Sequence, residues 1–211
     1  LRRPRFSPEL VAFHAPTQPA ALRYRDLHSA IREAVASKAV VDHFVLLFSG
    51  VRAGVGTTNA LLNVAISAAR QESRTLVIDA NLRRPAVAGR VGLEGAPGLT
   101  DVLASDSSLD AAIRPTDQEN LFVLPAGEPQ PLFADIRTLH DLVAGLRERY
   151  DYVFVDGPPW DGRPLVSSLA SGSGAVFLVL PAAEADSLPA SDLIRDLPRQ
   201  GVRLAGSVLI A

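Results

Sequence analysis

The sequence predicts an α/β fold with a doubly wound, mostly parallel sheet flanked by helices. Short, continuously apolar stretches of strand length alternate along the chain with stretches of helical periodicity. This alternation is typical of a parallel sheet that helices cover on both faces. Polar or glycine-rich motifs follow three of the apolar stretches, and open α/β sheets bind their ligands at such strand ends.

The elements are predicted in order along the chain. Residues 1–19 contain four prolines and little periodicity, so we expect a flexible arm ahead of one domain over 20–211. A helix over 22–36 has Leu27, Ile31 and Val35 spaced four apart. Strands are predicted at 44–49, 74–79, 121–125, 152–156, 175–180 and 203–210, and further helices at 58–70, 99–104, 109–113, 134–150 and 191–200.

Composition excludes several classes of function. The 211 residues suffice for one well-buried domain, and the formal charge of −2 with mixed signs argues against a dedicated nucleic-acid binder. No apolar run reaches 18 residues, and no cysteine is present, which fits a reducing cytoplasm. The four histidines are scattered without metal-ligand spacing. Because the chain ends directly after an apolar run, we expect a truncated C-terminus.

A glycine-rich loop follows the first strand. Glycines there allow close approach of the backbone to a phosphate, and the following helix start offers free N–H groups. The standard loop reads GxxxxGK[ST], and its lysine position is Thr57 in this chain. A glycine-rich turn without a ligand is the alternative. The candidate nucleotide-binding residues are Arg52, Gly54, Val55, Gly56, Thr57 and Thr58, of which the Thr58 hydroxyl would also hold Mg²⁺.

The second motif, LVIDANLRRP, ends a strand at Asp79. Asp79 could polarise a water molecule or hold a metal ion, whereas Asn81 can only form hydrogen bonds. Arg83 and Arg84 offer guanidinium groups for phosphates or for carboxylates of a neighbouring subunit. The alternative is an aspartate that caps a turn beside a solvated basic pair.

The third motif, YDYVFVDGPP, places Asp156 after an apolar strand. This is the Walker B arrangement, in which the aspartate orients Mg²⁺ through water. The alternative is a turn, because glycine and two prolines follow. Three such strand ends in this order favour a nucleotide site over three unrelated turns.

Five segments carry a resemblance to a known group of proteins: GVGTTNALLNVA, LVIDANLRRP, PGLTDVLASDSSLDAAI, LFVLPAGEPQP and YDYVFVDGPP. From about residue 20 to 211 the chain resembles the bacterial tyrosine kinases (BY-kinases) and the related MinD/ParA ATPases. The resemblance implies a cytoplasmic P-loop domain at the inner face of the membrane. Such domains act with a transmembrane polysaccharide co-polymerase in capsule or exopolysaccharide production. They phosphorylate their own tyrosine-rich tail with Mg-ATP.

The resemblance also implies which site residues are kept and which are lost. Asp79 and Arg83 match the Walker A′ motif DxDxR, in which Asn81 replaces the second aspartate. Arg52 stands where MinD/ParA proteins have their signature lysine. The implied Mg²⁺ ligands are Thr58, Asp79 and Asp156, and the implied catalytic residues are Asp79, Asn81 and Arg83.

The assembly motif ExxRxxR of the family is reduced to its middle residue. It aligns with Leu22, Arg25 and His28, so only Arg25 matches. The chain has three tyrosines and no tyrosine cluster at its end. We therefore expect a monomer or dimer rather than the ring of the family.

Three functions follow from these observations. The first is a degenerate kinase (pseudokinase) with regulatory or scaffolding action in exopolysaccharide assembly or export, for which binding of ATP or ADP and Mg²⁺ is doubtful. The second is an active tyrosine autokinase or ATPase in which Arg52, or a residue supplied by a partner, replaces the missing lysine. The third is a MinD/ParA-like positioning ATPase, against which the absence of a basic patch argues.

Overall fold

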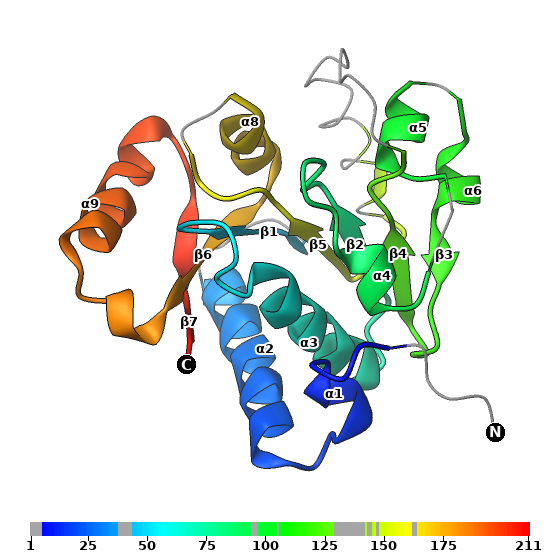
Figure 1. The fold of residues 1–211 in the computed structure, drawn as a ribbon, viewed down its shortest axis with the longest axis horizontal. Helices are drawn as coiled ribbons and strands as arrows, with labels where there is room; N and C mark the ends of the chain where they lie inside the picture. Colours follow the sequence, from blue (N-terminus) through cyan, green and yellow to red (C-terminus); the bar gives the residue numbers. More distant parts are fainter. Residues whose placement is uncertain are drawn as a thin grey trace.

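A computed structural model describes residues 6–37, 44–93, 97–104, 106–128, 142, 145–146, 148–161 and 164–211. Seven strands form one sheet in the order β3-β4-β2-β5-β1-β6-β7 (Figure 1). All neighbouring pairs are parallel except β3 and β4. The predicted mostly parallel, doubly wound sheet is confirmed. The strands are β1 (Phe44–Gly50), β2 (Thr75–Asp79), β3 (Arg114–Pro115), β4 (Leu121–Leu124), β5 (Tyr152–Asp156), β6 (Ala175–Pro181) and β7 (Leu204–Ile210).

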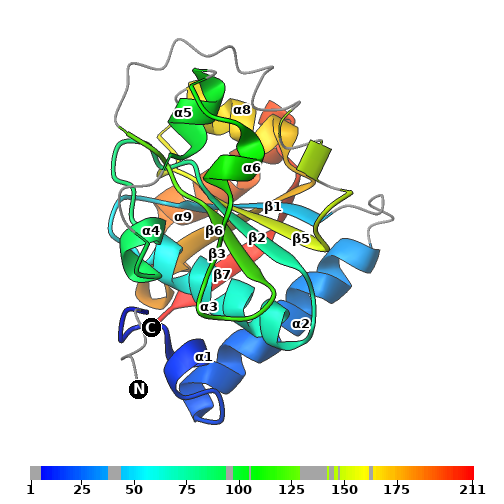
Figure 2. The same cartoon turned by 90° about the vertical axis from the view of Figure 1, so that its right-hand side faces the viewer.

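Helices cover both faces of the sheet, because alternate strand residues point to opposite sides. Leu46 and Phe48 of β1 pack with one helical layer, and Val45 and Leu47 pack with the other. Figure 2 shows the two layers above and below the twisted strands. One layer contains α1 (Val11–His14), α2 (Pro19–Ser37) and α3 (Thr57–Arg70), and the other contains α5 (Leu99–Leu103), α6 (Leu109–Ala112), α8 (Pro164–Gly172) and α9 (Leu188–Asp196).

The sheet register brings two acidic residues together. Asp79 at the end of β2 is the direct partner of Asp156 at the end of β5. Phe48 of β1 is paired with Asp156 on the other side, just before the glycine-rich loop. The carboxyl ends of the three central strands therefore lie side by side, as the sequence predicts for the site.

The prediction of a flexible arm over 1–19 is wrong for its described part. Residues 6–18 fold back on the domain, with Phe6 and Leu10 buried in the same core cluster as α3. The amide of Ser7 donates to the carbonyl of Arg90, and Arg70 donates to the carbonyl of Phe13. Helix α1 is a single turn, too short to give a visible helical period. Residues 1–5 lie outside the described residues.

Asn63 on α3 holds this N-terminal segment in place. Its side chain is fully buried, accepts from the amide of Ala12 at 2.9 Å, and donates to the carbonyls of Glu9 and Asn59. Asn63→Ala is expected to lower the free energy of unfolding by about 1–3 kcal/mol, because buried backbone groups lose their partners. Urea unfolding measures this change, and limited proteolysis should show earlier cleavage near residues 6–15.

The exposed variant Gln200→Ala serves as the control and is expected to change stability by less than about 0.5 kcal/mol. An Asn63→Ala protein with unchanged stability and unchanged cleavage would show that the segment is held by its apolar contacts alone.

Two motifs that are distant in sequence pack closely against each other beside the carboxyl end of β4. A Cβ on Gly98 would stand 2.2 Å from the amide nitrogen of Gly127, and Gly127 has a φ of 86°. The Thr100 hydroxyl donates to the carbonyls of Ala126 and Glu128. PGLTDVL and LPAG therefore depend on each other, because only glycines allow the two backbones to approach this closely.

The other predicted elements agree with the structure to within a few residues, apart from the helix over 134–150. That segment lies mostly outside the described residues. The sequence also missed α4 (Val87–Arg90), α8 and β3, which are short and contain glycine, proline or serine. Among the described helices, none is long and apolar enough to cross a membrane.

Candidate functional site

The loop between β1 and α3 forms a hollow of about 300 Å³. Gly54 and Gly56 have φ values of 79° and 93°, which side chains with a Cβ rarely adopt. This backbone turns the chain into α3 at Thr57, and the first N–H groups of a helix have no partner within it. The lining comes from the loop and first turn of α3, the segment after β2, the end of α4 and the turn after β5. The hollow has the form of a phosphate cradle.

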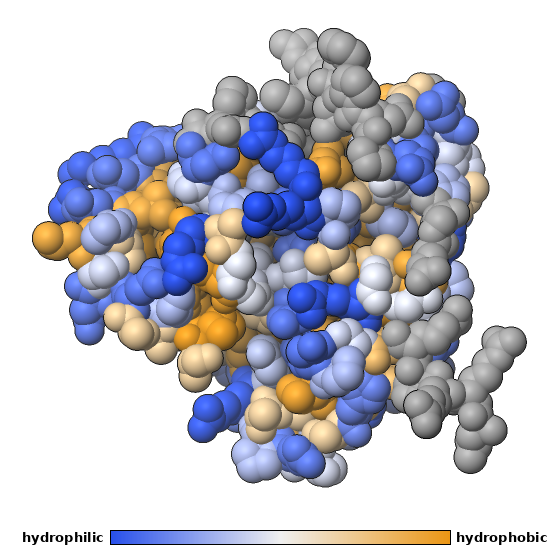
Figure 3. Space-filling view, in the orientation of Figure 1, coloured by the Kyte–Doolittle hydropathy of each residue, from blue (hydrophilic) through white to orange (hydrophobic). Residues whose placement is uncertain are grey.

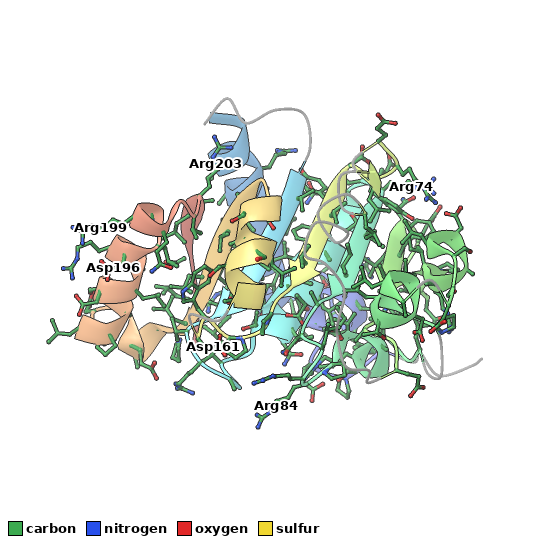
Figure 4. All side chains as sticks on the ribbon, turned by 90° about the horizontal axis from the view of Figure 1, so that it is seen from above. Arg74, Arg84, Asp161, Asp196, Arg199 and Arg203 are labelled. Atoms are coloured by element: carbon green, nitrogen blue, oxygen red, sulfur yellow. The ribbon has the colours of Figure 1, made fainter. Side chains whose placement is uncertain are left out.

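Most of the predicted binding residues lie on this hollow. Arg52, Gly54, Gly56, Thr57, Thr58 and Asn81 line it. Val55 is buried instead, with 7% of its surface exposed, and packs into the core beneath the loop. Arg83 is exposed and is not part of the lining, a position that its neighbour Arg84 takes instead. Figure 4 shows the Arg84 side chain projecting from the edge of the molecule.

Thr58 and Asp156 form the best-defined contact of the site. The Thr58 hydroxyl donates to Oδ2 of Asp156 at 2.7 Å, and Asp156 is fully buried. Oδ1 of Asp156 has no hydrogen-bond partner among the described residues. Burial raises the pKa of Asp156 to about 7, with the nearby Asp79 charge adding to this shift. The buried oxygen without a donor suits a bound cation.

Asp79 is engaged by the backbone. Its Oδ2 accepts from the amides of Ala86 and Val87 at 2.9 and 3.0 Å, and its Oδ1 accepts from the amide of Asn81. Burial raises the pKa of the Asp79 carboxyl, and these three hydrogen bonds oppose the shift. The Asp79 carboxylate thus holds the start of α4 in place. This structural role is separate from the metal binding that the Walker A′ motif predicts for it.

The predicted magnesium ligands fit the ion in part. A hydroxyl and a carboxylate oxygen stand together at Thr58 and Asp156, and Mg²⁺ in nucleotide sites uses one or two such protein ligands plus waters and phosphates. Among the described residues, no group of three or more acidic, histidine or cysteine side chains could hold a metal alone. The residues present therefore fit Mg²⁺ that arrives with a nucleotide.

The cations around the hollow are arginines. Thr57 is neutral, and its hydroxyl lies 2.7 Å from where a Cβ on Gly50 would stand, inside the curve of the loop. Arg52 donates to Oε1 of Glu184 at 2.6 Å, and this hydrogen bond raises the pKa of Arg52. Glu184 belongs to the short 3₁₀ turn Ala182–Glu184 after β6. Arg52 is thus held by a carboxylate at the rim.

Sequence reasoning missed Asn59 and Arg90, which line the hollow together. Arg90 ends α4, and its Nη1 donates to Oδ1 of Asn59 on the first turn of α3. Figure 3 shows strongly hydrophilic residues across the middle of this face of the molecule. No sequence motif marks Arg90 as a site residue. Its side chain reaches the site only because α4 packs beside the first turn of α3 in the folded chain.

Two of the three positions that align with the assembly motif, Arg25 and His28, differ in burial. Arg25 is exposed on α2 beside Asp26. His28 is buried with 1% of its surface exposed, lies edge-on to the Tyr152 ring and contacts Gln71 through Nδ1. Burial lowers the pKa of His28. In this position the His28 side chain is not available to a neighbouring subunit.

Sequence comparison finds tyrosine kinases. No protein-family model matches the chain. It is 28% identical over 169 residues to the tyrosine-protein kinase CpsD of Streptococcus pneumoniae serotype 4, which is 78% of this chain and 74% of that protein. It is 27% identical over 154 residues to the tyrosine-protein kinase Wzc of Salmonella typhi, which is 72% of this chain. The match covers only 21%, about a fifth, of the length of Wzc.

Structural comparison agrees. The VpsO kinase domain superposes with a TM-score of 0.73 at 31% identity, over 90% of this chain and 96% of that domain. The kinase domain of the Escherichia coli tyrosine kinase ETK gives a TM-score of 0.87 at 22% identity, over 99% of this chain and 82% of that chain. MinD of Pyrococcus horikoshii, solved with Mg-ADP, gives 0.68 at 23% identity over 79% of this chain and 69% of that chain, a likeness in fold.

Proposed function

We propose, since this chain belongs to the bacterial tyrosine kinase family, that it is a degenerate member, a pseudokinase. It acts as a regulatory or scaffolding protein in exopolysaccharide or capsule assembly and export, with weak or no turnover of nucleotide. Its partner is a transmembrane polysaccharide co-polymerase or another protein of the export machinery. It works in the cytoplasm, at the inner face of the inner membrane, as a monomer or dimer.

One observation carries the proposal: the glycine-rich phosphate loop contains Thr57 at the position of its lysine. Phosphoryl transfer depends on positioning and on neutralising charge on the phosphate oxygens. A single arginine finger contributes about 10³–10⁵ in rate, or roughly 4–7 kcal/mol in the transition state, and we expect the loss of the lysine to be of similar order. Arg52, the replacement suggested by the sequence, is paired with Glu184 instead.

The second departure lies in the Walker A′ motif. Asn81 lines the hollow but carries no charge and cannot act as a base. Asp79 remains, yet its two carboxylate oxygens accept three backbone hydrogen bonds. A general base that also holds the start of a helix is less free to accept a proton from a substrate hydroxyl. The missing carboxylate at Asn81 is therefore expected to lower the rate of phosphoryl transfer further than the missing cation at Thr57 does alone.

The binding part of the site is retained. The glycine loop and the first turn of α3 offer backbone N–H groups to a phosphate, and Thr58 with Asp156 would hold Mg²⁺. Mg²⁺, when bound with a nucleotide, supplies positive charge to the phosphate oxygens. We therefore expect ADP and ATP to bind more weakly than in an intact P-loop, without the chemistry that follows.

Transfer of label from γ-labelled ATP tests this function. The purified chain is incubated with Mg-ATP beside the VpsO kinase domain as a positive control, and phosphotyrosine is measured by mass spectrometry. We expect no phosphotyrosine on Tyr24, Tyr150 or Tyr152 above the level of an Asp156→Asn variant. Label on tyrosine that disappears in Asp156→Asn would overturn the proposal.

An active autokinase is the second candidate, and the intact Thr58–Asp156 contact favours it. In that case a partner or a second copy would supply the missing cation. Adding membranes that contain the co-polymerase to the same assay separates the two functions. Label that appears only with those membranes favours the autokinase, and its absence under both conditions favours the pseudokinase.

A further inference from the structure

We propose that Arg90 supplies the positive charge that the phosphate loop lacks at Thr57, so that the hollow binds a diphosphate group through a guanidinium. This inference rests on the proposed retention of a phosphate cradle, and it names the residue whose positive charge would attract the phosphates. The ligand class is a phosphate ester or anhydride with at least two linked phosphates, as in nucleoside diphosphates or pyrophosphate.

The backbone of Arg90 is fixed from two sides. At the start of its helix, Asp79 accepts hydrogen bonds from the amides of Ala86 and Val87. At the end of the helix, the carbonyl of Arg90 accepts from the amide of Ser7 at 2.7 Å. The Walker A′ aspartate and the N-terminal segment therefore set the position from which the Arg90 side chain enters the site.

The guanidinium itself is aimed at the first turn of α3. Nη1 donates to Oδ1 of Asn59, the residue directly after Thr58, and lies 3.9 Å from a carboxylate oxygen of Glu9. Nε is buried and has no acceptor among the described residues. A buried N–H donor without a partner costs free energy, and an anionic oxygen in the hollow would satisfy it.

Arg90 is better placed than the other two arginines of the hollow. Its side chain is 32% exposed and forms its ion pair with Glu9 at the long distance of 3.9 Å, whereas that of Arg52 is 57% exposed and donates to Glu184 at 2.6 Å. Arg84 is exposed and projects from the edge of the molecule (Figure 4). A charge that is partly removed from water acts more strongly on a nearby anion than a solvated one. The charge of Arg90 also reaches Asp156, where it opposes the rise in pKa of that carboxyl.

A double-mutant cycle tests this assignment. Calorimetric titrations with ADP, pyrophosphate and adenosine are made on the unchanged chain, Arg90→Gln, Thr57→Lys and the Thr57→Lys/Arg90→Gln double variant. Arg90→Gln is expected to weaken ADP and pyrophosphate at least about 10-fold and to leave adenosine unchanged. In the Thr57→Lys background the same substitution should cost less than about 3-fold, because lysine then carries the charge.

Two further variants separate charge from folding. Arg199→Gln is the matched control and is expected to change ADP affinity by less than about 3-fold, since that exposed arginine is paired with Asp196 and does not line the hollow. Arg90→Lys keeps a cation and should retain more of the affinity than Arg90→Gln. If Arg90→Gln lowers the melting temperature, Arg90→Lys still measures the effect of charge.

Unchanged affinity in Arg90→Gln, or an equal loss with and without the Thr57→Lys substitution, would overturn the assignment. So would a failure of the unchanged chain to bind ADP and pyrophosphate at millimolar concentration, although the scaffolding function would then stand. Phosphotyrosine formation, by contrast, would overturn the pseudokinase and leave the role of Arg90 intact. Pyrophosphate bound as tightly as ADP would identify the phosphates, rather than the nucleoside, as the recognised group.

Discussion

The double variant Thr57→Lys/Asn81→Asp is expected to hydrolyse ATP at least about 100-fold faster than the unchanged chain. The restored lysine would neutralise the β- and γ-phosphates, a contribution that we take to be similar to the factor of about 10³–10⁵ that a single arginine finger supplies in such sites. The restored aspartate would return charge to the Walker A′ motif. Thr58, Asp156 and the glycine loop are already in place to receive them. Phosphate release at saturating Mg-ATP measures the rate.

The single variants serve as controls for this gain. Thr57→Lys alone should recover part of the rate, and Asn81→Asp alone should recover little, because the cation is then still missing. The triple variant with Asp156→Asn should return to background, since it removes the carboxylate that would hold Mg²⁺. Equal rates in the double variant and the unchanged chain would show that the loss of activity lies elsewhere.

Stability is expected to fall as the pH rises from about 4 to about 7. The folded pKa of Asp156 is about 7, above the ordinary value of 3.8, chiefly because the carboxyl is buried. The folded chain therefore keeps a proton that the unfolded chain releases, so the free energy of unfolding decreases with pH across this window. The shift corresponds to a loss of up to about 4 kcal/mol, which is complete above pH 7. Urea unfolding at several pH values measures it.

Asp156→Asn removes this titration and is expected to be more stable than the unchanged chain at pH 8. Its carbonyl oxygen can still accept from the Thr58 hydroxyl, and no carboxylate must be buried. Asp186→Asn, at an exposed position, is the control and should leave the pH profile unchanged. A chain that becomes more stable between pH 4 and 7, or an Asp156→Asn profile with the same slope, would contradict this explanation.

The sequence was sufficient for the sheet and the phosphate loop because both follow local patterns. Continuous apolar runs predicted β1, β2, β5 and β6 almost to the residue, and buried parallel strands require such runs. The glycines at 54 and 56 predicted a phosphate loop, and both have positive φ angles in the structure. Asp79 and Asp156 fell at strand ends, and the parallel register of β2 and β5 made them direct partners.

The rest of the site depends on contacts between distant segments. Phe6 and Leu10 gave no helical period, yet they bury against the core and bring Glu9 and Ser7 to Arg90. Arg52 was the nearest candidate in the sequence to replace the lysine, but Glu184 from the turn after β6 pairs with it. Such pairings follow from the tertiary fold and have no signature in the neighbouring residues.

Isothermal calorimetry with ATP and Mg²⁺ tests most directly whether the site binds nucleotide without turning it over. We predict a saturable heat of binding for each of ADP and ATP, with no continuing heat after the ATP injections. A continuing heat that lasts until the ATP is consumed, and that is lost in Asp156→Asn, would contradict the account and identify an active enzyme. An absence of any binding heat would contradict the retained phosphate cradle.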